Sequence, residues 1–255
     1  MFEDIVNTLA EFKSIQAVGI SGGEPFVEKR GLEYSVQRLS QAQKKIVLYT
    51  SGHWGNSGRK TWVDSILNQV NTVVLSTDAF HNSSITAEVF SQAIQRIADS
   101  GAWLIIQVIP SEQTKQKINN TLIEVFGESW HEFAEINEIP LLNHGRAQKY
   151  FPPPVKKTIE NISKCTRSNS PVVRYDGVIT ACTNESVIAG KGPKALRQQI
   201  TEGKNLAETL ANLSRNKIIK ALAVDGPNAL DAEYNLVQQR FCNVCDVCWH
   251  VLNQE

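Results

Sequence analysis

The feature that most constrains this chain is a regular alternation of amphipathic helices and short apolar strands in its first 150 residues. The expected strands are 17–21, 46–50, 72–76, 103–109 and 139–142, preceded by helices 3–13, 32–43, 61–69, 86–99 and 113–126. Neighbouring parallel strands need a crossover, and helices of this length supply it. The pattern predicts a parallel α/β fold with its working residues at the carboxyl ends of the strands.

Polar groups and glycines gather at those expected strand ends. They occur in the segments Gly22–Pro25, Ser51–Gly55, Thr77–His81 and Asn143–Ala147. Adjacent glycines let a ligand approach the backbone closely, and a carboxylate beside them can accept hydrogen bonds from an ammonium group. Each feature also has a purely structural explanation: a glycine turn, a helix cap at Asp78, or an ion pair at Arg146.

The cysteines form a second strong pattern. All five lie in the last third of the chain, at Cys165, Cys182, Cys242, Cys245 and Cys248. The last three form a CxxCxxC run, a spacing that lets thiolates converge on one metal ion or cluster. An odd number of cysteines cannot pair completely as disulfides. The spacing therefore predicts a metal or iron-sulfur site.

Charge and hydropathy argue against a nucleic-acid-binding protein, a membrane protein and a secreted protein. Lys plus Arg and Asp plus Glu each total 26, so no basic excess is available for a phosphate backbone, and we expect no nucleic-acid partner. No apolar run is long enough to cross a bilayer, so we expect no membrane partner. The acidic start of the chain is unlike a signal peptide, and we expect a cytoplasmic protein.

A break in the middle of the chain predicts two domains. Phe151-Pro152-Pro153-Pro154 cannot continue a helix or a central strand, so we expect domains at 1–150 and 151–255. In the second domain, two short strands are expected around an Asp-Gly turn within 172–180. Helices are expected at 193–201, 204–213 and 234–240.

Three segments together resemble the radical S-adenosylmethionine (radical SAM) enzymes. Gly22-Gly23-Glu24-Pro25 is similar to the GGEP segment that binds the amino group of the SAM methionine. The segment from Ser76 to Asp78 is similar to the one that faces the SAM ribose. Gly145-Arg146-Ala147 resembles the segment beside the SAM adenosine. The resemblance implies a partial parallel (β/α) barrel whose first strand is missing, with these residues binding SAM.

The last third of the chain resembles the SPASM and twitch domains, which hold an auxiliary [4Fe-4S] cluster. The resemblance assigns Cys165, Cys182, Cys242 and Cys245 as the cluster ligands. Cys248 is then left over, and it could replace Cys245 as a ligand or serve a second cluster. Five cysteines cannot fully ligate two four-cysteine clusters, so one cluster is preferred.

The chain departs from the family at one point. The CxxxCxxC motif, which binds the SAM-cleaving [4Fe-4S] cluster, precedes GGEP in the family and does not occur in this sequence. The second cluster is therefore expected only if that motif is restored, and the chain as written is expected not to cleave SAM. A start placed too late and a degenerate homologue both explain this, and the intact SAM-binding segments favour the former.

The resemblance implies an oxidoreductase or maturase. A 5′-deoxyadenosyl radical would abstract a hydrogen atom from a peptide or small-molecule substrate, with electrons from a flavodoxin or ferredoxin. Two alternatives stay open. The chain could be a catalytically inactive partner or scaffold, or an α/β protein whose cysteines form a structural four-thiolate zinc site.

Overall fold

The computed structural model describes residues 1–56, 58, 61–77, 85–109, 111–139, 152, 154–168, 170–200 and 206–254. The chain forms two compact units. One comprises Glu3–Gly145, and the other comprises Arg146–Glu255 together with Met1–Phe2.

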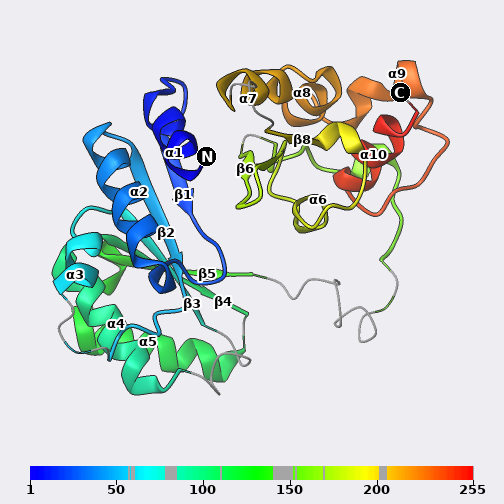
Figure 1. Ribbon diagram of the computed structural model, residues 1–255. Helices are drawn as coiled ribbons and strands as arrows, with labels where there is room; N and C mark the ends of the chain where they lie inside the picture. Colours follow the sequence, from blue (N-terminus) through cyan, green and yellow to red (C-terminus); the bar gives the residue numbers. More distant parts are fainter. Residues whose placement is uncertain are drawn as a thin grey trace. The chain divides into compact units, whose positions relative to one another are not determined.

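The first unit is built on a five-stranded parallel sheet with the order β1-β2-β3-β4-β5 (Figure 1). Its strands are β1 (Ala17–Ile20), β2 (Lys45–Thr50), β3 (Thr72–Thr77), β4 (Trp103–Val108) and β5 (Ala134–Glu138). Each strand pairs with the next one in sequence. Each new strand is added on the same side of the one before it. Because crossovers between parallel strands are right-handed, every connecting helix then lies on the same face of the sheet. This topology is that of a partial (β/α) barrel, as predicted from the sequence.

The helices of this unit line one face of the sheet, and α2 to α5 follow one another along it (Figure 1). They are α1 (Phe2–Glu11), α2 (Lys29–Gln41), α3 (Thr61–Leu67), α4 (Ala87–Ser100) and α5 (Glu112–Phe126). Their apolar sides form one core with alternate strand residues such as Leu48, Leu75 and Ile106, each fully buried. The residues between these point to the opposite face of the sheet, because side chains alternate along a strand.

The last strand lies earlier than expected. The structure forms β5 at Ala134–Glu138, so the prediction of a strand beginning at Ile139 was wrong, and 140–142 lie outside the described residues. Only Ala134 and Ile136 of β5 face the core, and charged or polar residues lie between them. Its few apolar residues give a weaker hydrophobic signal for a strand than the Ile-Pro-Leu-Leu run that follows it, so the sequence favoured the later segment.

The second unit contains a small antiparallel sheet and several short helices. The sheet has the order β6-β7-β8, with β6 (Val172–Val173), β7 (Val178–Thr180) and β8 (Arg197–Gln199). The helices are α6 (Glu185–Ile188), α7 (Leu206–Ser214), α8 (Lys217–Val224), α9 (Asp231–Tyr234) and α10 (Val244–Leu252). The turn between β6 and β7 is at Asp176-Gly177, where Gly177 has a φ of 78°. The expected hairpin is confirmed.

Two expected helices of this unit were wrong. The described part of the segment expected at 193–201, residues 193–200, contains a 3-10 turn, η5 (Lys194–Leu196), followed by β8, and forms no α-helix. The expected helix at 234–240 does not form either, because α9 ends where Asn235 adopts a left-handed conformation with a φ of 49°. Leu206–Ser214 is helical, as expected for the segment from 204 to 213.

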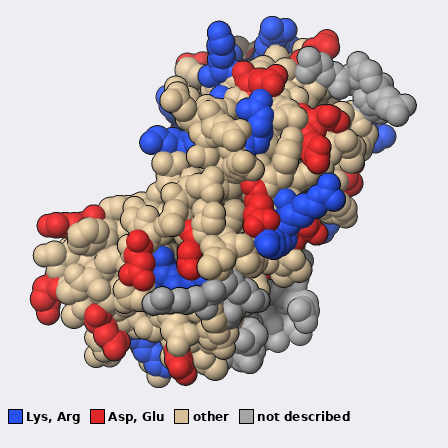
Figure 2. All heavy atoms as spheres, turned by 60° about the vertical axis from the view of Figure 1, so that its left-hand side comes forward, with Lys and Arg blue, Asp and Glu red and all other residues tan. Residues whose placement is uncertain are grey.

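Charged side chains are mixed on the face of the molecule shown in Figure 2. Lys and Arg lie among Asp and Glu, and the described residues of this face form no continuous basic area. Within the described part of the chain, no helix has the length and apolar character needed to cross a membrane.

Candidate functional site

The first cluster of site residues is centred on the carboxylate of Glu24, in the turn after β1. Glu24 Oε1 accepts a hydrogen bond from Thr50 Oγ1 at 2.8 Å and another from the Phe26 backbone N–H at 3.3 Å. Glu24 Oε2 accepts from the backbone N–H of Ser51 at 2.8 Å and from Ser51 Oγ at 2.7 Å. The Glu24 side chain is only 14% exposed. It therefore ties the turn after β1 to the carboxyl end of β2.

Thr50 extends this network into the core. Its hydroxyl oxygen accepts hydrogen bonds from the indole Nε1–H of Trp54 at 2.9 Å and from the Gly52 N–H at 3.1 Å. Thr50 is a polar side chain on the helix-covered face of the sheet, and it is buried at 5% exposure. Its hydrogen bonds compensate for the cost of that burial.

The two glycines before Glu24 leave an open backbone surface. Among the described residues, a Cβ added at Gly22 or at Gly23 would meet no atom within 4 Å, and neither glycine has a positive φ. The protein itself therefore does not require glycine at either position. A ligand that approaches this backbone closely would explain both residues.

Three polar side chains form a row on the sheet face opposite the helices. Ser76 of β3 is in register with Gln107 of β4, and Gln107 is in register with Asn137 of β5. Ser76 Oγ also donates a hydrogen bond to the Thr50 carbonyl at 3.4 Å. Asn137 was missed in the sequence because β5 was placed too late, although the alternation of Ala134 and Ile136 with polar residues was a signal for it.

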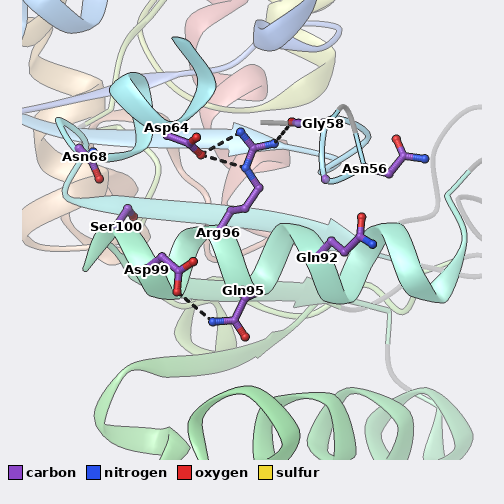
Figure 3. A pocket seen from close by; sticks show the side chains of 10 residues that line it. Asn56, Gly58, Asp64, Asn68, Gln92, Gln95, Arg96, Asp99 and Ser100 are labelled. Atoms are coloured by element: carbon purple, nitrogen blue, oxygen red, sulfur yellow. Dashed lines mark hydrogen bonds and ion pairs between the residues drawn. The ribbon is translucent and has the colours of Figure 1, made fainter. Parts of the chain in front are cut away.

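The loop after β2 is held against the helices by Arg96 of α4. The guanidinium donates to Asp64 Oδ1 of α3 through Nε at 2.9 Å and Nη2 at 2.8 Å (Figure 3). Nη1 donates to the carbonyls of Trp54 at 3.2 Å and Gly58 at 3.4 Å. These groups border a polar pocket of about 690 Å³. Arg96 fixes the loop whose first residue, Ser51, binds Glu24.

Several expected SAM-binding residues lie outside the described residues. These are Asp78, Gly145, Arg146 and Ala147. Of the others, Gly22, Gly23 and Glu24 share one turn, and Pro25 begins the 3-10 turn η1 (Pro25–Val27) directly after it. Ser76 lies two strands away, at the carboxyl end of β3.

The cysteines of the second unit are held by different elements. Cys245 and Cys248 are three residues apart on α10 and so lie on the same side of that helix. The backbone N–H of Cys165 donates to the carbonyl of Leu222, in the last turn of α8, at 2.9 Å. Cys182 follows β7, and its carbonyl accepts a hydrogen bond from Thr180 Oγ1 at 2.8 Å.

Four of the five thiols lie close enough for their charges to interact. Burial, followed by the charges of Cys245, Cys182 and Cys165, raises the pKa of Cys248 to about 12. Burial, followed by the charge of Cys165, likewise raises the pKa of Cys182 and of Cys245, although hydrogen bonds from Asn184 partly oppose this. The raised pKa values of Cys182, Cys245 and Cys248 are those expected of thiols in a partly buried region near other cysteines.

Cys242 lies apart from this group. Its thiol is 3.9 Å from the carbonyl of Pro154, and its backbone N–H donates to Asp246 Oδ2 at 2.9 Å. Burial, followed by Asp246 beside it, raises the pKa of the Cys242 thiol, and none of the other cysteines contributes. A neighbouring carboxylate disfavours the thiolate form of Cys242, whereas other cysteines contribute to the raised pKa of Cys248.

The cysteines of the second unit are candidate ligands for a metal ion or a cluster. Among the described residues, no three His, Cys, Asp or Glu side chains are arranged closely enough to hold a metal ion. The chemistry of the four neighbouring thiols nevertheless fits an iron-sulfur cluster or zinc. Ser168 Oγ, three residues after Cys165, is a buried polar atom that finds no hydrogen-bond partner in the described part of the chain.

Comparisons with known proteins add one observation. No family model matches the chain. The chain is 24% identical over 268 residues to a protein of Bacillus subtilis (strain 168). That protein is named "Putative peptide biosynthesis protein YydG". The alignment covers 98% of this chain and 81% of YydG. The alignment thus spans both units of the chain.

Proposed function

We propose that this chain has the fold and the SAM-binding segments of a radical SAM enzyme that modifies a peptide, with SAM bound at the carboxyl ends of β1 to β3. Because the sequence lacks the CxxxCxxC motif, the SAM-cleaving activity of such an enzyme would require that motif to be restored. The observation that carries the proposal is the open Gly22-Gly23 turn, braced by Glu24 at the end of a singly wound parallel sheet. The similarity to YydG, which is named for peptide biosynthesis, supports a peptide as the substrate. SAM beside a reduced [4Fe-4S] cluster supplies hydrogen-atom abstraction when both are bound.

The residues of the first unit would bind and orient the cofactor and substrate. The backbone of Gly22 and Gly23 would bind the methionine end of SAM. The carboxylate of Glu24 accepts four hydrogen bonds from the protein, so its first role would be to hold that backbone in place. Ser76, Gln107 and Asn137 offer hydrogen-bonding groups on the uncovered face, where the substrate would lie.

Equilibrium dialysis with labelled SAM tests the SAM site. Gly23→Val should lower SAM affinity at least tenfold, because the new side chain fills the space the ligand needs. The unfolding temperature should stay close to that of the wild type, since a Cβ at this position meets nothing. Equal SAM binding by the two proteins, or no binding by either, would overturn the assignment of this turn.

We also propose that the second unit holds one auxiliary [4Fe-4S] cluster through Cys165, Cys182, Cys245 and Cys248. The interaction among these four thiols and the separation of Cys242 support this set. It differs from the set implied by the family resemblance, which used Cys242 and left Cys248 aside.

Iron and acid-labile sulfide per chain, measured after anaerobic reconstitution, test the ligand set. Wild type should contain about four of each. Cys248→Ser should lose most of its iron, and the matched variant Cys242→Ser should keep it. The reverse result would restore Cys242 to the set, and one zinc with no sulfide in the wild type would identify a structural zinc site instead.

A further inference from the structure

Asn184 connects two of the proposed cluster ligands. It lies two residues after Cys182, and its side-chain Nδ2 is 3.3 Å from Cys245 Sγ on α10. The Asn184 backbone also lowers the pKa of the Cys182 thiol. The side chain of Asn184 thus donates to the sulfur of one proposed ligand, and its backbone lies near the other.

The orientation of the Asn184 amide follows from its second role. Asn184 is the N-cap of α6, and its Oδ1 accepts hydrogen bonds from the backbone N–H groups of Ser186 at 2.9 Å and Val187 at 3.2 Å. Both partners are donors, so the oxygen must face them. The amide NH₂ must therefore face Cys245. The residue is 8% exposed, so water competes little for these bonds.

We propose that Asn184 is a positioning residue that raises the reduction potential of the auxiliary cluster by donating a side-chain hydrogen bond to the Cys245 thiolate. This inference rests on the cluster proposed above. One-electron reduction of [4Fe-4S]²⁺ to [4Fe-4S]⁺ adds one negative charge to the cluster and its thiolates. N–H donors aimed at the sulfurs stabilise that charge, and such hydrogen bonds are among the factors that set iron-sulfur potentials.

Two substitutions separate the sulfur donor from the helix cap. Asn184→Ser keeps an N-cap of similar strength, but the short hydroxyl cannot span the distance to Cys245. Asn184→Asp keeps both cap acceptors and the shape of the side chain while replacing the donor with a negative oxygen. Asn216 provides matched controls, because its Oδ1 caps α8 by accepting from Ile218 and Ile219.

The decisive measurement is a potentiometric titration of the reconstituted 255-residue protein with dithionite, followed by the EPR signal of the reduced cluster. Asn184→Ser should lower the potential, and Asn184→Asp should lower it further because of the added charge. Asn216→Ser and Asn216→Asp should match the wild type. An unchanged potential in Asn184→Ser, with wild-type iron and sulfide, would overturn the proposal. If Asn184→Ser does not fold, Asn184→Asp replaces it in the titration. An unchanged potential in Asn184→Asp, with wild-type iron and sulfide, would then overturn the proposal.

Iron and sulfide contents separate this proposal from the cluster proposal. Loss of iron in both folded Asn184 variants, with retention in both Asn216 variants, would also support the role of Asn184. If the wild type takes up zinc without sulfide, the cluster proposal fails. The Asn184 contact is then tested with Co²⁺ in place of zinc. A shift of the thiolate-to-cobalt absorption in Asn184→Ser supports the contact, and an unchanged spectrum or no metal binding at all overturns it.

Discussion

The carboxylate of Glu24 makes the residue a structural brace as well as a candidate site group. Both oxygens accept two hydrogen bonds each, from Phe26 and Thr50 on one side and from Ser51 on the other. Glu24→Gln replaces one acceptor oxygen with an amide donor, which faces other donors. We expect a loss of about 1–3 kcal/mol in the free energy of unfolding, measured by urea denaturation without ligand.

Glu28 provides the control for that substitution. It also accepts a backbone hydrogen bond through its side chain, from Gly31 at 3.4 Å, but this contact is exposed. Glu28→Gln should change the free energy of unfolding by less than about 0.5 kcal/mol. If the two variants lose the same stability, the network around Glu24 does not brace the turn.

At the scale of elements, the loop after β2 depends on close packing against α4. A Cβ at Gly55 would lie 2.1 Å from the carbonyl oxygen of Val89 and 3.0 Å from the amide nitrogen of Ala93. Both are backbone atoms of a helix and cannot move aside. Gly55 has no positive φ, so the requirement for glycine here is steric. Gly55→Ala should cost about 1–3 kcal/mol or more, measured by urea denaturation.

Gly22→Ala is the matched control for Gly55→Ala. It adds the same methyl group at a glycine with open space and no positive φ. Its free energy of unfolding should stay within about 0.5 kcal/mol of the wild type or rise slightly, because alanine restricts the unfolded chain. A Gly55→Ala variant as stable as Gly22→Ala would show that the loop is not packed against α4 as described.

The sequence predicted elements well where apolar residues dominate them. The runs Ile46–Thr50 and Trp103–Ile109 were predicted as strands, and both form. The segments Ala134–Glu138 and Arg197–Gln199 were missed, because strands this polar are specified by backbone pairing with a neighbour and not by their own hydropathy.

Site residues were also predicted where their neighbours in sequence identify them, and they were missed where only the folded chain brings them together. Gly22, Gly23 and Glu24 stood out because adjacent glycines and a carboxylate follow an apolar strand. Asn184 could not be found that way, since its contact with Cys245 joins residues 61 positions apart. For the same reason, spacing alone leaves open which of Cys242, Cys245 and Cys248 are ligands.

At the scale of the whole molecule, all five cysteines belong to one of the two units, whereas the other has a large core of its own. The second unit has only short strands and short helices, and small units of this kind often depend on a metal or disulfide for stability. If the second unit holds the proposed cluster, removing it with a chelator should therefore reduce amide hydrogen-exchange protection in 206–252, measured by mass spectrometry. Protection in β2, β3 and β4 should stay unchanged, because these strands pack on the helices of their own unit.

Two variants provide the control for this prediction. Cys248→Ser should reproduce the chelated state, and Cys242→Ser should resemble the wild type with its cluster. Protection lost equally in both units would show that they unfold as one cooperative body. Protection lost in neither would show that the cysteine site does not contribute to the stability of its own unit.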